Sequence, residues 1–277
     1  MRINKDSLSA RVLNIAKEKG ISANVVYSRY FFDCFLKRLS LSPYSEKFIL
    51  KGGLFLSSVL GIENRATMDI DFIVRKIRLE RVEIIDIIKE ICRVSADDNV
   101  SFLYIGESEI KKDDIYRGFS ISIEGRLENI RQRFDIDLAT ADIVYPSDQN
   151  YEYQCLVTGE TLHLKSYSIE SVVAEKMQTF LVRGALNSRA KDLYDLYVLA
   201  KLVEKNEDTL KTAFKETCQC RKFEIDKDKA IKTFESVSLS PMQRKVWESF
   251  SRKTSYAKEI SFDEVLVTIG RLIKIIF

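Results

Sequence analysis

Residues 50–74, LKGGLFLSSVLGIENRATMDIDFIV, decide the fold of this chain. The apolar run at residues 48–50 predicts a buried strand, because it is short and ends at a lysine and two glycines. The paired glycines lead into an apolar segment of helical character, and residues 68–74 predict a second strand. We expect the remaining elements to assemble around this strand–helix–strand unit.

The second predicted strand carries two aspartates, Asp69 and Asp71, with one apolar residue between them. Side chains alternate along a strand, so both carboxylates lie on one face, about 7 Å apart. Neighbouring carboxylates repel each other, and a cation between them removes that cost. We therefore predict that Asp69 and Asp71 bind a divalent metal ion.

The glycine pair, Gly52 and Gly53, predicts a phosphate site beside this metal site. Glycine permits a tight turn from a strand into a helix, and free backbone N–H groups at a helix N-terminus suit a phosphate. A phosphate site next to paired carboxylates is the arrangement that nucleotidyl transfer requires.

A third carboxylate is expected from residues 131–138, a second apolar run interrupted by acids. An unpaired buried carboxylate is costly, so these acids face either solvent or the same cation. Two-metal phosphoryl transfer uses three carboxylates, and we choose Asp137 as the third. Asp135 shares its face and stays an alternative, as does a salt bridge from either acid to Arg131 or Arg133.

Further charged residues occur in the helical half of the chain. Lys176 falls on the apolar side of the helix predicted at residues 169–183, where an ammonium group needs either water or an anion such as a triphosphate. The next helix places Asp192 and Asp195 on one side, with Arg189 one turn earlier. Acids in a first turn also interact with the helix dipole without any further role.

Composition excludes several classes of protein. The chain has 277 residues, of which 45% are hydrophobic and 31% charged, and it is expected to be ordered, soluble and cytoplasmic. No apolar run reaches membrane-spanning length, and the N-terminus does not look like a signal peptide. One histidine and five cysteines in dissimilar contexts exclude a Cys/His metal cluster and a Ser-His-Asp triad.

Net charge alone does not predict nucleic-acid binding, since it is only +3. Basic residues do cluster at residues 75–81, 126–133 and 183–191. Solvated surface explains the first cluster, whereas the last lies beside the charged motif of the helical half and slightly favours RNA.

The sequence pattern changes near residues 164–168. Before it, helical and alternating β-type runs predict a mixed sheet with flanking helices, an α/β or α+β fold. After it, only helical periodicity occurs. We therefore predict a core domain over residues 1–165 and a helical C-terminal domain over residues 166–277, which contributes Lys176 and Asp192 to the site.

Taken in order, these motifs resemble the AbiEii/AbiGii family of nucleotidyltransferase-like toxins of abortive-infection and type IV toxin–antitoxin systems. The similarity covers about residues 45–200, and the matching segments are residues 50–53, 65–72, 136–138, 142, 175–176 and 187–196. Its most specific parts are the R-x-T before the D-x-D motif and the R-x-K-D-x-Y-D after the lysine.

The resemblance implies an α+β fold with a DNA polymerase β-like nucleotidyltransferase core, followed by a helical region. It implies a nucleoside triphosphate (NTP) donor, Mg²⁺ or Mn²⁺, a cognate antitoxin encoded alongside, and the 3′ end of a tRNA as acceptor, whose modification blocks translation and growth. Some members are described as binding GTP. A non-catalytic GTP-binding protein, or a transferase acting on an antibiotic-like molecule or a protein, therefore stays an alternative.

The resemblance also implies roles for single residues. Asp69 and Asp71 hold both metal ions, and Asp137 completes the one that activates the acceptor hydroxyl. Lys176 neutralises triphosphate charge as pyrophosphate leaves, and Asp192 is essential by analogy, orienting either Lys176 or the acceptor. Arg189 and Asp195 are expected to support these groups.

The nucleotide is expected to contact Lys51, Gly52, Gly53, Arg65 and Lys176. Arg65 reaches a phosphate or braces the turn before the D-x-D strand. Many nucleotidyltransferases have Gly-Ser where this chain has two glycines, so a serine hydroxyl is missing. Either Ser57 or Ser58 supplies it, or the backbone binds the phosphate alone.

Overall fold

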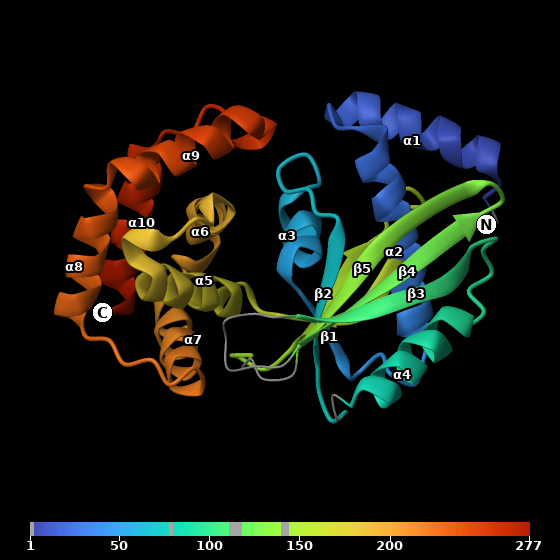
Figure 1. Ribbon diagram of the computed structural model, residues 1–277, viewed down its shortest axis with the longest axis horizontal. Helices are drawn as coiled ribbons and strands as arrows, with labels where there is room; N and C mark the ends of the chain where they lie inside the picture. Colours follow the sequence, from blue (N-terminus) through green and yellow to red (C-terminus); the bar gives the residue numbers. More distant parts are fainter. Residues whose placement is uncertain (1–2, 78–79, 111–117, 140–143) are drawn as a thin grey trace. The chain divides into compact units, whose positions relative to one another are not determined.

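The computed structural model describes residues 3–77, 80–110, 118–139 and 144–277 of the chain. The chain forms two compact units, one of residues 1–141 with 149–166 and the other of residues 142–148 with 167–277. The first unit contains a mixed seven-stranded sheet with flanking helices, and the second is built from helices (Figure 1). This is the predicted α+β fold.

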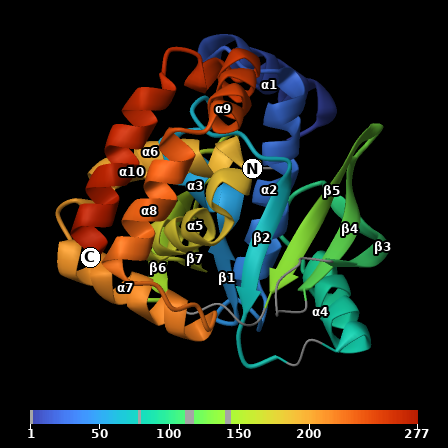
Figure 2. The same cartoon turned by 60° about the vertical axis from the view of Figure 1, so that its left-hand side comes forward.

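The sheet has the strand order β3-β4-β5-β2-β1-β7-β6, and β2 lies near its middle. β2 runs antiparallel to β1 and parallel to β5, and Figure 2 shows β5, β4 and β3 continuing the sheet beside it. The strands are β1 Phe48–Lys51, β2 Asp69–Val74, β3 Ser101–Ile110, β4 Gly118–Leu127, β5 Ile130–Ala139, β6 Gln149–Gln154 and β7 Thr161–Ser166.

Among the residues that the structure describes, four helices flank the sheet, namely α1 Lys5–Lys19, α2 Ala23–Leu41, α3 Gly52–Leu60 and α4 Arg81–Arg93. α2 is the central one, because its aromatic side chains are buried against the sheet: Phe32 packs edge-on against Phe134, and Phe35 against Phe102. This apolar core fixes one face of the sheet and leaves polar side chains to the other.

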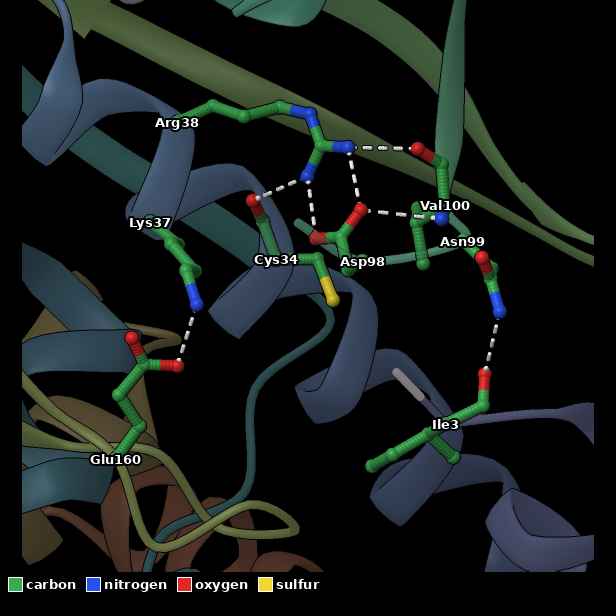
Figure 3. Close-up of polar contacts among 8 residues, drawn as sticks. All are labelled: Ile3, Cys34, Lys37, Arg38, Asp98, Asn99, Val100 and Glu160. Atoms are coloured by element: carbon green, nitrogen blue, oxygen red, sulfur yellow. Dashed lines mark hydrogen bonds and ion pairs between the residues drawn. The ribbon is translucent and has the colours of Figure 1, made fainter. Parts of the chain in front are cut away.

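A buried ion pair fastens α2 to the segment that leads into β3 (Figure 3). The Arg38 guanidinium donates to both carboxylate oxygens of Asp98, over 2.7 and 2.6 Å, and to the Val100 carbonyl over 2.6 Å. The two charged side chains are only 5% and 11% exposed. Such a two-pronged, dehydrated pair holds the entry of β3 in one geometry.

The second unit contains six α-helices, namely α5 Ile169–Arg183, α6 Ala190–Val203, α7 Glu207–Cys220, α8 Lys227–Ser238, α9 Pro241–Lys253 and α10 Phe262–Ile276. Ser168 is the N-cap of α5, and its hydroxyl accepts a hydrogen bond from the Ser171 N–H and donates one to the Tyr145 carbonyl. The Tyr145 carbonyl also accepts a hydrogen bond from the Ser171 hydroxyl, and the Tyr145 N–H donates one to the Ser171 hydroxyl oxygen. The segment before β6 therefore holds the first turn of α5.

None of the helices that the structure describes is both long enough and apolar enough to cross a membrane.

Candidate active site

β2 and β5 bring four aspartates onto one face of the sheet. The strands are parallel neighbours, with Asp69 opposite Asp135 and Asp71 opposite Asp137. Directly opposed side chains share a face, and adjacent strands lie about 5 Å apart. The intervening residues are fully buried on the opposite face, and these are Ile70, Phe72, Ile136 and Leu138. The predicted metal-binding acids thus form one contiguous patch.

The carboxyl group of Asp71 has a raised pKa. Burial and the nearby Asp69 and Asp137 carboxylates raise its pKa, the Lys51 ammonium and the Gly53 N–H oppose the shift, and the resulting pKa is about 6. Lys51 is the cross-strand partner of Asp71 on β1, so its side chain lies on the same face. Crowded carboxylates with a raised pKa are typical of a site that gains from a bound cation.

The two candidates for the third carboxylate have different neighbours. Asp135 is exposed and accepts a hydrogen bond from the Ser122 hydroxyl on β4. Asp137 is partly buried and acts on the pKa of Asp71 across the strand pair. This electrostatic coupling favours Asp137 over Asp135.

The glycine turn makes close contact with these acids. Gly52 has φ +62°, and a Cβ atom there would lie 2.0 Å from Asp71 Oδ2. A Cβ atom on Gly53 would lie 2.4 Å from the Thr67 hydroxyl oxygen. The Gly53 N–H donates to Asp71 Oδ2 over 3.2 Å. The sequence predicts that this N–H is free for a phosphate, but here it is bonded to the carboxylate. The turn therefore orients Asp71.

Thr67 and Arg65, which precede the D-x-D motif, also hold the site in place by hydrogen bonds. The Thr67 hydroxyl donates to Asp69 Oδ1, a contact that sequence analysis missed although Thr67 lies within the R-x-T motif. Arg65 is 5% exposed, and its Nη1 donates to the Ala66 carbonyl over 3.1 Å. This position favours the bracing role for Arg65 over a direct contact with a phosphate.

The two serines of α3 are hydrogen-bonded within the fold. Ser57 is 3% exposed, and its Oγ accepts from Arg29 Nη1 over 3.2 Å within a buried polar cluster. The Ser58 hydroxyl donates to the Phe55 carbonyl and accepts from Tyr151. Helix packing directs both hydroxyls into the fold, which favours the alternative in which the backbone binds the phosphate, and a phosphate contact by Ser57 or Ser58 stays a prediction.

In the second unit, the predicted lysine and acids form one ion-pair network. Lys176 Nζ lies 2.5 Å from Asp192 Oδ1 and 2.8 Å from Asp195 Oδ2. Burial lowers the pKa of Lys176, but the Asp195 and Asp192 carboxylates outweigh it and raise the pKa overall. Arg189 Nη1 lies 4.0 Å from Asp192 Oδ2. The matched residue Asp142 lies outside the described residues.

The donor set suits a hard cation, because carboxylate oxygens are the ligands that Mg²⁺ prefers. In the described part of the chain, however, no three His, Cys, Asp or Glu side chains are already arranged to hold a metal ion. Asp69 is turned toward Thr67, and Asp71 toward the Gly53 N–H. Each of these hydrogen bonds engages one oxygen of its carboxylate, so metal binding requires the side chains to reorient but not to give up both oxygens.

A solved structure has a similar fold. A protein from H. pylori described as a candidate nucleotidyltransferase has a TM-score of 0.50 and 17% identity, over 92% of this chain and 96% of that chain. JHP933 from Helicobacter pylori gives a TM-score of 0.48 and 17% identity, over 92% of each chain. A search of curated proteins finds no match.

The family of the chain follows from a match to a family model and not from these distant structures. The model for the nucleotidyl transferase AbiEii toxin of type IV toxin–antitoxin systems matches residues 34–268. The match includes both the aspartate face of the sheet and the Lys176 network. The chain therefore belongs to the AbiEii nucleotidyl transferase toxin family of type IV toxin–antitoxin systems.

Proposed function

We propose that this toxin transfers a nucleoside monophosphate from an NTP to the 3′ end of a tRNA, in a reaction that depends on Mg²⁺ or Mn²⁺. The modified tRNA no longer serves translation, and growth stops. The observation that carries the proposal is the register of β2 and β5, which aligns Asp69 and Asp71 with Asp135 and Asp137 on one face.

Three acids of this face have assigned roles in the proposal. Asp69, Asp71 and Asp137 would hold the divalent ions, which lower the pKa of the acceptor hydroxyl and neutralise charge on the phosphates when bound. Gly52 allows the turn to approach Asp71, and Lys51 adds a positive charge beside it. Most of the rate enhancement in such a site comes from positioning and charge neutralisation.

Lys176 is proposed as a second positive group for the triphosphate. Asp192 and Asp195 fix its ammonium group and, by raising its pKa, keep it charged throughout the physiological pH range. That this network completes the same site as the aspartate face stays a prediction, as do the supporting roles of Arg189 and Asp195. The proposal also includes a cognate antitoxin encoded alongside and a cytoplasmic location.

The test is incubation of the purified protein with each labelled NTP in turn and with total RNA, followed by sequencing of RNA 3′ ends. Label at tRNA 3′ ends supports the proposal. Label on a protein or a small molecule would assign a different acceptor. Bound GTP without any transfer would assign a non-catalytic role instead.

A further inference from the structure

Three arginines lie on the same face of the sheet as the aspartates, further along the β4–β5 hairpin. On β5, Arg131 and Arg133 precede Asp135 and Asp137 at alternate positions, so the four side chains share one face. Arg126 on β4 lies directly opposite Arg131. We call Arg126, Arg131 and Arg133 the arginine face.

A buried carboxylate organises two of these arginines. The Glu124 side chain is 5% exposed and accepts from Arg126 Nε over 2.7 Å and from Arg133 Nε over 2.8 Å. The hydrogen bonds from Arg133 and Arg126 lower the pKa of Glu124. No hydrogen bond or ion pair joins either guanidinium to any other residue that the structure describes. Their terminal nitrogens therefore remain available as donors for an anion.

The arrangement of charge also points to an anion. Arg126 and Arg131 are directly opposed across the two strands, and like charges in that position destabilise a sheet. Two of the three guanidinium groups share the Glu124 carboxylate. Arg131 and Arg133 are exposed, with 70% exposure for the Arg133 side chain, and the Arg126 side chain is 37% exposed. A bound polyanion would remove this repulsion without dehydrating the arginines strongly.

The distance along β5 defines the size of that anion. Arg131 and Asp137 lie six positions apart, which corresponds to about 20 Å along an extended strand. An acceptor of drug size cannot contact both ends of this path. A nucleic-acid strand can, because its phosphates repeat at regular intervals along its length.

We propose that the arginine face binds the phosphodiester backbone of the acceptor RNA strand, a few nucleotides before the 3′ end that lies at the aspartates. The inference rests on the proposed function, in which the acceptor is RNA. It assigns the path of the acceptor along β5 and gives a role to the basic cluster at residues 126–133.

The test measures binding and transfer separately. Wild-type protein, Arg131→Gln, Arg126→Gln and the control Arg93→Gln are titrated into a 5′-labelled single-stranded RNA without NTP, at several salt concentrations. Arg93 is exposed at the end of α4 and carries the same charge, so its replacement changes net charge equally. Circular dichroism confirms that each variant is folded.

For Arg131→Gln and Arg126→Gln we expect affinity to fall about five-fold at low salt, and the slope of log K against log salt to become shallower by about 0.7. Arg93→Gln should change neither quantity. A DNA strand of the same sequence should show the same dependence on the arginines, since the phosphates are shared, and incorporation of label then identifies which strand is the acceptor.

The outcomes separate the two proposals. Equal affinity and salt slope in all three variants and the wild type would overturn the arginine face, even where the wild type elongates RNA. Arginine-dependent RNA binding without any incorporation by the wild type would support the surface and contradict the transferase assignment.

Discussion

At the scale of single residues, Asp71 and Asp135 provide a matched pair for testing the metal site. Both lie on the same face, but Asp71 is coupled to Asp69 and Asp137, whereas Asp135 is exposed and bonded to Ser122. Asp71→Asn should lower the rate of nucleotide incorporation by about 100-fold or more, because a carboxylate that neutralises charge in the transition state is lost. Asp135→Asn should retain most of the rate. A larger loss of rate for Asp135→Asn than for Asp71→Asn would contradict the assignment of Asp71, and not Asp135, as a metal ligand.

The raised pKa of Asp71 also predicts how stability depends on pH without metal. The folded protein keeps this proton up to about pH 6, whereas the unfolded chain releases it near pH 4. Stability therefore falls as pH rises through this window, and the cost is fully present above it. In EDTA at about pH 7.5, Asp71→Asn should stabilise the fold, by on the order of 1–3 kcal/mol, and the gain should disappear near pH 4. Thermal unfolding at both pH values measures this, and a destabilised variant at pH 7.5 would contradict it.

Lys176 requires a design that separates stability from chemistry. Lys176→Met leaves the Asp195 carboxylate, which is 0% exposed, without its ammonium partner. We expect a loss of about 3–5 kcal/mol in urea unfolding, as for other broken buried pairs. The double variant Lys176→Met/Asp195→Asn should recover much of this stability. If it also recovered nucleotide incorporation, the proposed contact between Lys176 and the triphosphate would be refuted.

At the scale of elements, the strand-to-helix turn at Gly52 depends on both backbone conformation and space. Gly52→Ala places a Cβ atom on Asp71 in addition to the cost of a positive φ. Gly20→Ala carries only the cost of the positive φ, which is +64° there, because no atom lies within 4 Å of the added Cβ. We expect about 1 kcal/mol for Gly20→Ala, and a clearly larger loss with abolished incorporation for Gly52→Ala. Similar melting temperatures for both variants would show that the approach of the turn to Asp71 is not required.

The Arg38–Asp98 pair should determine how firmly β3 is attached to α2. Arg38→Met leaves Asp98 in a site where its side chain is only 11% exposed, so we expect a loss of about 3–5 kcal/mol in urea unfolding. Arg244→Met breaks a pair whose side chains are 44% and 69% exposed and should leave the unfolding midpoint unchanged. Equal effects of the two variants would contradict a structural role for the buried pair.

Elements with strong local patterns were predictable, and those that depend on distant partners were not. Alternation of acids with Ile and Phe predicted the strands that became β2 and β5. β7 was not expected, because Thr161–Ser166 contains only two apolar residues. It forms a strand by pairing with β1 and β6. The hydrogen bond of Ser57 was not predictable for a similar reason, since its partner Arg29 comes from α2. Periodicity placed each pair of aspartates on one face of its own strand, whereas the pairing of β2 with β5 and the hydrogen-bonding partners needed coordinates.

At the scale of the whole molecule, the polypeptide alternates between its two units. Residues 1–141 belong to the sheet unit and residues 142–148 to the helical unit. Residues 149–166 belong to the sheet unit again, and residues 167–277 to the helical unit. The first of these passages supplies Tyr145, which holds the opening turn of α5. A single scission therefore cannot release two intact halves, and recombination between related genes could exchange either half only through several junctions made at once.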